Sequence, residues 1–246
     1  MTQSDQDARE AYDCLFIVPV FNEAATLEQA ILFLYSALEE VLPPTMRWDI
    51  VVADNGSHDG TDNIAKKLSV AGYAQAFFCT QKGRGLALRE VLRAYPQSTL
   101  YCYCDCDIPV EPSSITRLLE PLMHEKADVA VLKRSGPRPL SRRILSLGYR
   151  FLLIALFRIH FSDVQAGIKV FHARMLPVII HRCVENGYFF DTEFIVRAIQ
   201  KKYRVVEVTA PWIEQRFSVR KSKIHPLKDS LQALKALVRI YSRFHR

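Results

Sequence analysis

Residues 101–109 read YCYCDCDIP, an apolar alternating run that ends in two carboxylates and then a proline. The alternation predicts a buried strand, and Pro109 predicts that strand pairing stops there. Because alternate side chains of a strand share a face, Asp105 and Asp107 can turn toward one point at its carboxyl end. Such a pair suits a hard divalent cation that bridges phosphate oxygens. Taken alone, an Asp-x-Asp is more often the opening of a turn or a helix cap.

The amino-acid composition limits the fold class of the protein and the kinds of partner that it can bind. With 246 residues, 49% of them hydrophobic, the chain can form one large α/β domain with a substantial core. The net charge of +7 allows nucleic acid, an anionic membrane surface or a phosphorylated substrate as partner. None of the six cysteines forms a Cys-x-x-Cys pair, so we expect small buried thiols in a reducing compartment.

The chain divides into three predicted parts. Residues 1–13 are polar and lack the features of a signal peptide, which predicts a flexible tail. Residues 14–215 form the main domain, with an apolar basic helical insert at 139–161, and residues 216–246 form a basic loop and an amphipathic helix. No stretch approaches the roughly 18 apolar residues that a membrane span needs, so we expect a cytoplasmic protein.

Three strand-helix units precede the acid pair. This order predicts right-handed crossovers and a mostly parallel sheet. The strands are predicted near 15–21, 49–53 and 76–79, and the helices near 24–41, 61–68 and 86–94. Later strands are expected near 127–132 and 204–208, and residues 163–171 are expected to be a loop that enters a short strand. Later helices are expected near 113–125, 144–158, 191–201 and 226–244.

Two further polar loops follow strands of this sheet. Residues 54–61, DNGSHDGT, describe a tight loop in which a carboxylate can face a nucleotide. Residues 81–85, QKGRG, suit an anion at a helix start, although the spacing is neither that of a P-loop nor that of a dinucleotide fingerprint. Each loop alone is also an ordinary turn. Both should lie with the acid pair at one sheet edge, where open α/β sheets bind ligands.

Two helices combine apolar and basic residues. Residues 144–158 are punctuated by arginines, which fits a helix in a membrane interface, an internal helix or a dimer face. The helix at 226–244 is amphipathic and basic, and it fits either an anionic membrane or the protein core. A further helix is predicted to end near Lys201, and Asp191 or Thr192 is predicted to be its N-terminal cap. Glu193 would then lie in the first turn of that helix, either as a catalytic base or as an ordinary first-turn acid.

Over residues 15–223, these motifs in their order resemble the family-2 glycosyltransferases of the GT-A fold. Within that family they resemble the polyprenyl-phosphate and dolichol-phosphate mannosyl- and glucosyltransferases. Segments 18–23, 54–61 and 82–87 are similar to the family's nucleotide-binding segments, and 105–107 stands where its metal-binding Asp-x-Asp stands. The nucleotide contacts that this resemblance implies are Pro19, Val20, Asn22, Glu23, Asp54, Gly56, Lys82, Gly83 and Asp105.

The lipid-linked branch of the family adds an acceptor site. Arg134, Ser141 and Arg142 match the positions that hold the acceptor phosphate, and the apolar stretch to Phe157 matches interfacial helices. The later motif positions are matched by Asp163, Gly167, Lys169, Glu193, Ser222 and Lys223. Arg216 and Arg220 lie on either side of the family's pyrophosphate-binding arginine position. Asn55 replaces a frequent Asp, and Pro109 replaces a Gln that completes the metal shell.

The resemblance therefore implies an inverting transfer of mannose or glucose from GDP-mannose or UDP-glucose to a polyprenyl or dolichyl phosphate. Mg²⁺ or Mn²⁺ at Asp105 and Asp107 would stabilise the departing diphosphate. The residues expected to act beside the metal are Arg134, Arg142, Arg216, Arg220 and Lys223. The enzyme would work at the anionic cytoplasmic face of a membrane as a peripheral protein.

Two alternatives stay open. One is a soluble family-2 transferase that acts on a small phosphorylated acid or a glycan, with Glu193 or Asp191 as base and the apolar helix as a homodimer face. The other is a catalytically silent module that binds a nucleotide sugar or a membrane. Nucleic acid is not an expected partner, because the basic residues bracket an apolar helix instead of stacking aromatics.

Overall fold

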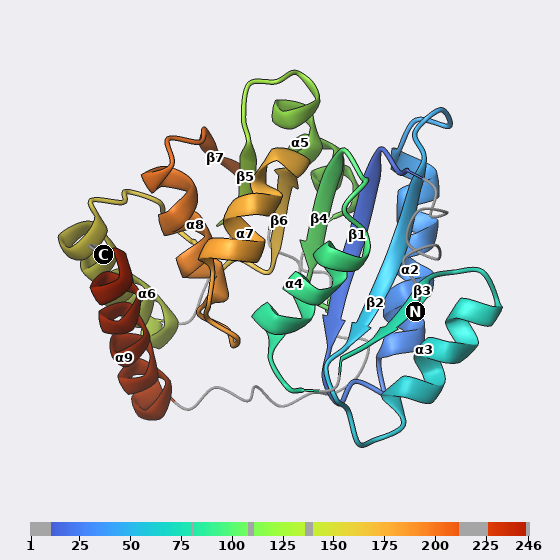
Figure 1. The fold of residues 1–246 in the computed structure, drawn as a ribbon, viewed down its shortest axis with the longest axis horizontal. Helices are drawn as coiled ribbons and strands as arrows, with labels where there is room; N and C mark the ends of the chain where they lie inside the picture. Colours follow the sequence, from blue (N-terminus) through green and yellow to red (C-terminus); the bar gives the residue numbers. More distant parts are fainter. Residues whose placement is uncertain (1–10, 80, 108–110, 136–139, 212–225, 245–246) are drawn as a thin grey trace.

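A seven-stranded sheet with helices on both faces forms the centre of the protein (Figure 1). The structure is a computed structural model that describes residues 11–79, 81–107, 111–135, 140–211 and 226–244. The side chains of 134, 140–145, 226–231 and 244 lie outside this description. The strands are β1 (Cys14–Val20), β2 (Trp48–Asp54), β3 (Gln75–Phe78), β4 (Leu100–Cys104), β5 (Val129–Ser135), β6 (Ile168–His172) and β7 (Val205–Pro211).

The sheet has the strand order β3-β2-β1-β4-β6-β5-β7. β1 pairs in parallel with β2 and β4, whereas β6 lies antiparallel between β4 and β5. β4 is buried over its whole length and β1 at all positions but one, which explains their continuous apolar sequences. The prediction of a mostly parallel α/β sheet is confirmed.

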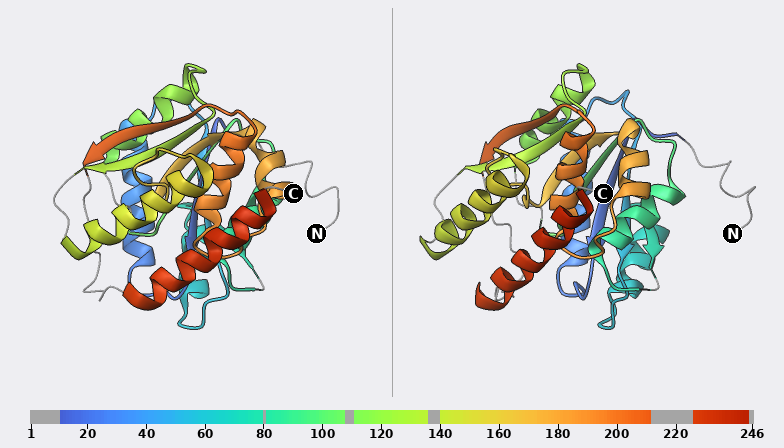
Figure 2. Two further views of the ribbon diagram at one scale, coloured as in Figure 1. Left: turned by 90° about the vertical axis from the view of Figure 1, so that its left-hand side faces the viewer. Right: turned by 60° about the vertical axis from the view of Figure 1, so that its left-hand side comes forward.

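The helices form a layer on each face of the sheet. α2, α3 and α5 pack on one face, and α4, α7 and α8 pack on the other. α6 and α9 lie side by side beyond α8 (Figure 2). In Figure 1 they are at the opposite end of the molecule from α3. The helices are α2 (Leu27–Val41), α3 (Thr61–Val70), α4 (Arg84–Ala94), α5 (Pro112–Met123), α6 (Leu140–Phe157), α7 (Leu176–Arg182), α8 (Phe190–Gln200) and α9 (Pro226–Phe244).

Most predicted elements are present within a few residues of their expected bounds. α7 was not predicted, because seven residues with a proline near their start give too little helical periodicity to recognise. The helix cap predicted at Asp191 or Thr192 is wrong: α8 begins at Phe190, with Phe189 as its N-cap residue and no side-chain cap. Within the described residues, none of the helices has both the length and the apolar character to cross a bilayer.

The six cysteines confirm the prediction of buried thiols. All six are free and buried. Burial raises the pKa of the Cys102 and Cys104 thiols, which therefore stay protonated and pack as small apolar groups.

The start of α4 packs unusually closely against residues 185–186. A Cβ atom added at Gly85 would lie 2.5 Å from the carbonyl oxygen of Glu185, and one added at Gly83 would lie 2.7 Å from that of Asn186. Both neighbours are backbone atoms, so they cannot turn away. Glycine at these positions therefore allows the approach that brings α4 against this segment.

Substitution Gly85→Ala should destabilise the protein by about 1–3 kcal/mol through overpacking, which is several degrees in Tm for a chain of this size. Thermal unfolding followed by circular dichroism measures the change. Gly148→Ala on α6 is the matched control, because no atom lies within 4 Å of an added Cβ there. The control should keep or raise Tm, since alanine is favoured over glycine within a helix. Equal loss of Tm in both variants would contradict the close approach.

Candidate active site

The carboxyl end of β4 carries Asp105 directly against the loop that leads into β6. The backbone amide of Asp105 donates to the carbonyl oxygen of Gly167, with a distance of 2.8 Å. A Cβ atom at Gly167 would collide with the Asp105 carboxylate. Gly167 therefore leaves the space in which this carboxylate lies.

An arginine links Asp105 to a second, buried carboxylate. The Nη2 atom of Arg84 lies 2.8 Å from Oδ1 of Asp105, and its Nη1 atom lies 3.4 Å from Oδ2 of Asp191. The guanidinium also lies over the rings of Tyr103 and Tyr188, 5.5 and 6.0 Å from their centroids. Burial alone would lower the pKa of the Arg84 guanidinium, but the charges of Asp105 and then Asp191 outweigh it and raise that pKa. Arg84 thus stays a cation.

Asp191 is held from three elements. Its Oδ1 accepts a hydrogen bond from the hydroxyl of Tyr103 on β4 and lies 3.3 Å from Nζ of Lys169 on β6. Lys169 is fully buried and also donates to the carbonyl oxygen of Ala166 at 2.7 Å. Burial raises the pKa of Asp191 to about 6, and the charge of Arg84 acts in the opposite direction. The carboxylate therefore titrates at a pH well above that of an ordinary aspartate.

The first two polar loops are connected by hydrogen bonds. The amide of Asn22, whose φ of 54° is left-handed, donates to Oγ of Ser57, and the amide of His58 donates back to Oδ1 of Asn22. Oδ1 of Asp54 accepts from both the amide and the hydroxyl of Ser57. The candidate nucleotide residues Asn22 and Asp54 thus belong to one ordered surface.

The third loop joins the same surface. The amide of Gly83 donates to Oδ1 of Asn55, and the amide of Asn55 donates to the carbonyl oxygen of Val20 at 3.0 Å. Lys82 is exposed, with its ammonium 3.7 Å from the centroid of the Phe21 ring. The two loops that the sequence placed beside the acid pair, those after β2 and β3, are therefore in contact. The loop after β1, which the family resemblance added, joins them. Arg84 follows the loop after β3 and pairs with Asp105.

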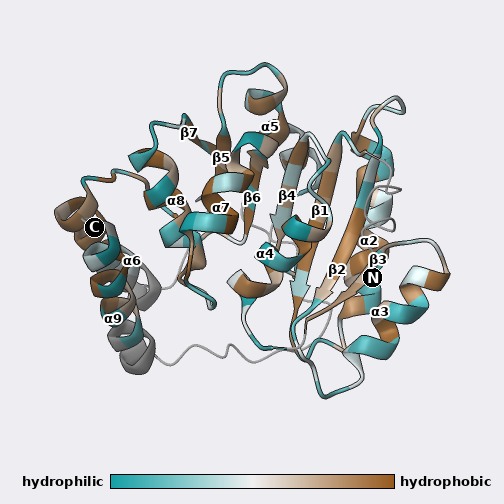
Figure 3. Cartoon of the chain, in the orientation of Figure 1, coloured by the Kyte–Doolittle hydropathy of each residue, from teal (hydrophilic) through white to brown (hydrophobic). Residues whose placement is uncertain are grey.

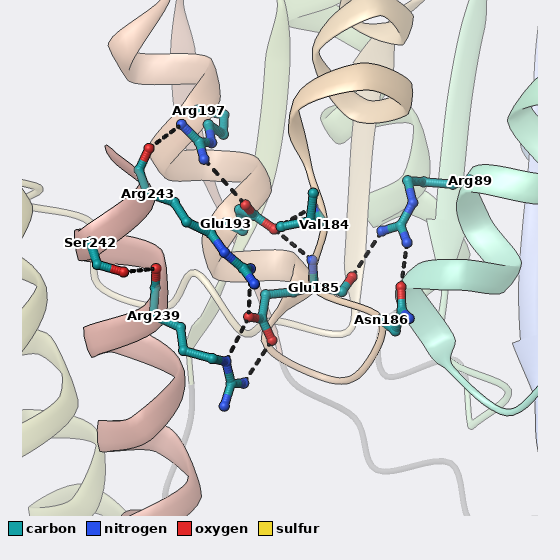
Figure 4. Close-up of polar contacts among 9 residues, drawn as sticks. All are labelled: Arg89, Val184, Glu185, Asn186, Glu193, Arg197, Arg239, Ser242 and Arg243. Atoms are coloured by element: carbon teal, nitrogen blue, oxygen red, sulfur yellow. Dashed lines mark hydrogen bonds and ion pairs between the residues drawn. The ribbon is translucent and has the colours of Figure 1, made fainter. Parts of the chain in front are cut away.

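Glu193 lies elsewhere and has a different environment (Figure 4). Its carboxylate is fully buried, and Oε2 accepts from the amides of Val184 and Glu185 at 2.8 and 2.7 Å. Its other oxygen lies 3.5 Å from Nη2 of Arg197. These contacts hold the backbone of the loop before α8, and they give Glu193 a structural role in this structure.

For several predicted site residues the structure describes the backbone but not the side chain. Arg134 lies on β5, and Ser141 and Arg142 lie in the first turn of α6, with side chains outside the description. Asp163 lies in the loop between α6 and β6, where its amide donates to Glu207 at 3.2 Å. Four predicted residues and the departure at Pro109 fall outside the described residues; the four are Arg216, Arg220, Ser222 and Lys223.

Three residues of the cluster were not predicted as site residues. Arg84 belongs to the QKGRG segment, but the sequence alone could not show whether Lys82 or Arg84 pairs with Asp105. Tyr103 belongs to a strand whose apolar pattern describes core, and it is fully buried. Tyr188 is 71% exposed. A tyrosine beside a turn is too common in sequences to signal a site.

The residues at the end of β4 fit a divalent cation only in part. Asp105 and Asp107 supply the hard oxygen ligands that Mg²⁺ and Mn²⁺ prefer. Within the described part of the chain, no group of three or more His, Cys, Asp or Glu side chains is arranged to hold a metal. A metal here would need further oxygens from water or a diphosphate, which is the usual way in which Mg²⁺ is bound beside phosphates.

Comparison with known proteins decides the family. The profile described as "Glycosyl transferase family 2" matches residues 15–178. The chain belongs to glycosyltransferase family 2. This match covers the three loops, the acid pair and the Gly167 loop, and it confirms the resemblance seen in the sequence.

Two curated relatives are similar over most of the chain. Glycosyltransferase AglD of Haloferax volcanii is 29% identical over 203 residues, which is 80% of this chain but 32% of that protein. The chain therefore spans about a third of that relative's length. The dolichyl-phosphate beta-glucosyltransferase of Saccharomyces cerevisiae is 23% identical over 247 residues, covering 90% of this chain and 72% of that protein.

Solved structures agree on the fold. Glucosyl-3-phosphoglycerate synthase from Mycobacterium tuberculosis, crystallised with Mn²⁺, UDP and glucosyl-3-phosphoglycerate, superposes with a TM-score of 0.70 at 21% identity. The match covers 94% of this chain and 80% of that one. The fold of this family-2 protein is therefore the GT-A fold, as predicted.

The environment of Asp191 predicts a pH dependence of stability. The unfolded chain loses this proton near pH 3.8, whereas the folded protein retains it to about pH 6. The unfolded state therefore binds fewer protons in this window, and the contribution of Asp191 to stability falls as the pH rises. Relative to Asp191→Asn, the free energy of unfolding of the parent should fall by up to about 3 kcal/mol between pH 4 and 7. Urea unfolding of both proteins across this range measures the difference. If the stability of the parent relative to Asp191→Asn rises with pH, the charges of Arg84 and Lys169 lower the pKa of Asp191 by more than burial raises it, which would contradict the prediction.

Proposed function

We propose that this family-2 glycosyltransferase moves a hexose from a nucleotide-diphosphate sugar to a polyprenyl or dolichyl phosphate at a membrane surface, with inversion at the anomeric carbon. The observation that carries the donor half is the meeting of the β1, β2 and β3 loops with Arg84 and Asp105. The name of the yeast relative supports the acceptor half and favours glucose as the sugar. UDP-glucose, which is bound in a solved structure of the mycobacterial neighbour, is therefore the first donor to test, with GDP-mannose beside it.

The donor site acts through charge. As the bond between sugar and diphosphate breaks, negative charge grows on the departing diphosphate, and groups fixed beside it lower the barrier. The cations that the structure describes near this site are Arg84, which pairs with Asp105, and the exposed Lys82. A Mg²⁺ or Mn²⁺ held by Asp105 and Asp107 would add Lewis-acid stabilisation of the same charge.

The acceptor needs a different kind of surface. A lipid phosphate is already an anion at neutral pH, so it can attack without a strong general base. Its repulsion from the carboxylates must be offset by cations, for which Arg134, Arg142, Arg216, Arg220 and Lys223 are the proposed candidates. The buried, hydrogen-bonded state of Glu193 agrees with a reaction that does not depend on it as a base.

The outer helices offer an apolar surface for the lipid. Leu147 and Phe151 of α6 are 62% and 69% exposed and lie one turn apart. Leu234, Val238 and Tyr241 form a similar exposed row on α9. Arg150 of α6 and Arg158, which directly follows α6, are exposed as well. Figure 3 shows apolar and polar residues alternating along the coloured part of α9. Exposed apolar rows with arginines nearby are typical of helices that lie in a membrane interface.

A soluble acceptor is the second candidate, because the mycobacterial neighbour is named for synthesis of glucosyl-3-phosphoglycerate and superposes over 94% of this chain. In that case the exposed rows of α6 and α9 would form a homodimer face. Phosphoglycerate therefore belongs in the acceptor panel.

A transfer assay tests the proposal. Purified protein with Mn²⁺ or Mg²⁺ and radiolabelled UDP-glucose or GDP-mannose should transfer label to a short polyprenyl phosphate, recovered in organic solvent, and a chelator should abolish it. Asp107→Asn should cut turnover by roughly a hundredfold, on the scale of lost electrostatic stabilisation. Asp62→Asn is the control, because Asp62 lies on α3 in a surface ion pair with Lys66.

Label that reaches phosphoglycerate but not the lipid would favour the soluble acceptor. Donor binding without any transfer would favour a silent binding module. Parent-like activity of Asp107→Asn would remove Asp107 from the site.

Membrane contact is tested separately by flotation with vesicles that contain anionic lipid. Phe151→Asp should lower the partition coefficient by about tenfold or more, because burial of a phenylalanine side chain contributes about 1.5–3 kcal/mol. Val70→Asp introduces the same charge at a 91% exposed apolar residue on α3, at the other end of the molecule, and should float like the parent. Equal flotation of both variants, or none for the parent, would contradict contact through α6.

A further inference from the structure

The C-terminal helix α9 is joined to the segment before α8 by a buried carboxylate (Figure 4). Oε1 and Oε2 of Glu185 accept hydrogen bonds from Nε and Nη2 of Arg239, at 3.1 and 2.9 Å. Nη1 of Arg243 lies 3.3 Å from Oε1 of the same carboxylate. Glu185 is 8% exposed, so its charge depends on these two arginines for compensation.

The backbone around Glu185 is fixed from two further sides. Its amide donates to Glu193 of α8 at 2.7 Å, and its carbonyl oxygen accepts from Nη1 of Arg89 of α4 at 2.9 Å. Arg89 also donates to Oδ1 of Asn186. Residues 184–186 therefore connect α9, α8 and α4 through hydrogen-bonded groups.

The same segment receives the first turn of α4. The carbonyl oxygen of Asn186 accepts from the amides of Gly85 and Leu86, at 2.8 and 3.3 Å. Arg84, which pairs with Asp105, directly precedes Gly85. A shift of residues 185–186 would therefore move the turn that carries Arg84, because backbone atoms meet here with no flexible side chain between them.

We propose that Glu185 is a positioning residue that couples α9 to the candidate donor site through residues 184–186 and the first turn of α4. This inference rests on the proposed function only where it concerns nucleotide binding. Under this proposal α9 has two roles. Its exposed apolar row is available to a lipid surface, and its residues Arg239 and Arg243, through Glu185, help to position Arg84. Contact of α9 with a lipid surface would then be transmitted to the donor site.

The physical driving force is the cost of a buried unpaired charge. With Arg239 removed, one of the two cations that compensate Glu185 is lost, and the carboxylate is drawn toward water. Its backbone follows, and the hydrogen bonds from Gly85 and Leu86 to Asn186 loosen. Glu185→Gln removes the charge while keeping the size of the side chain. It weakens the contacts to both arginines and so frees residues 185–186 from α9 without leaving a buried unpaired charge. Glu185→Gln should therefore also raise exchange at Gly85 and Leu86, although less than Arg239→Ala does.

The test uses the full chain with variants Arg239→Ala, Glu185→Gln and their combination. Lys235→Ala is the control, since it removes one positive charge from an exposed position of α9 that contacts no carboxylate within the described residues. Amide hydrogen exchange of residues 84–87 is the first readout and needs no ligand. The dissociation constant of UDP with Mn²⁺ is the second.

We expect Arg239→Ala to raise exchange at Gly85 and Leu86 and to weaken UDP binding, each by about tenfold, within the usual range of coupling between sites. Lys235→Ala should match the parent. In the Glu185→Gln background, Arg239→Ala should have little further effect, because both changes break one interaction.

Unchanged exchange at residues 84–87 in both Arg239→Ala and Glu185→Gln would overturn the coupling. A uniform rise that includes β1 and β4 would also overturn it, because it would show a general loss of stability. A parent that does not bind UDP would count against the proposed donor, while the exchange result would still decide the coupling. If Arg239→Ala does not fold, Glu185→Gln decides by the same readouts.

Discussion

The mutual compensation of four charges at the end of β4 is the constraint on which the rest of the site depends. Lys169 and Asp191 are almost completely buried, and Arg84 and Asp105 complete the group toward the surface. A buried charge without a partner is strongly destabilising, so each member fixes the others. Since Asp191 lies on α8, Lys169 on β6 and Arg84 on α4, the pairing also sets the relative positions of three elements around Asp105.

This charge pairing explains structural features that the neighbouring sequence does not explain. The antiparallel strand β6 lies between β4 and β5, which brings Lys169 beside Tyr103, its neighbour in the register of the sheet. Gly167 ends the loop before β6 without a side chain, which leaves room for Asp105. The close contact of Gly85 with Glu185 places Arg84 against both carboxylates. The cluster is therefore a product of tertiary packing more than of any one motif.

The sequence predicted the parts of the site that follow strands in order. The apolar run before Asp105 and the glycine-rich loops have local signatures, so the sheet and the meeting of the loops after β2 and β3 were predictable. The pairing of Arg84 with Asp191 was not, because it joins segments far apart in the chain. The same reason explains the wrong prediction of a cap at Asp191: an acid in a first helical turn is usually a capping or dipole group. Here the tertiary contacts to Tyr103, Lys169 and Arg84 take precedence.

The proposed reaction needs both a charged site and an apolar surface, and the chain places these on different layers. The donor loops follow parallel strands, whereas α6 and α9 pack on each other beyond α8 (Figure 1). The loop before α8 contacts both regions, through Arg239 on one side and Gly85 on the other. A lipid phosphate whose tail lies on the outer helices would meet its sugar donor across this connection.

The most direct test of the account is a crystal structure with Mn²⁺ and UDP, with the metal located by its anomalous scattering. The account predicts one strong anomalous peak within coordination distance of Asp105 and Asp107, with the diphosphate between that peak and the first turn of α4. A metal peak away from β4, or UDP bound away from the loops that follow β1, β2 and β3, would contradict it.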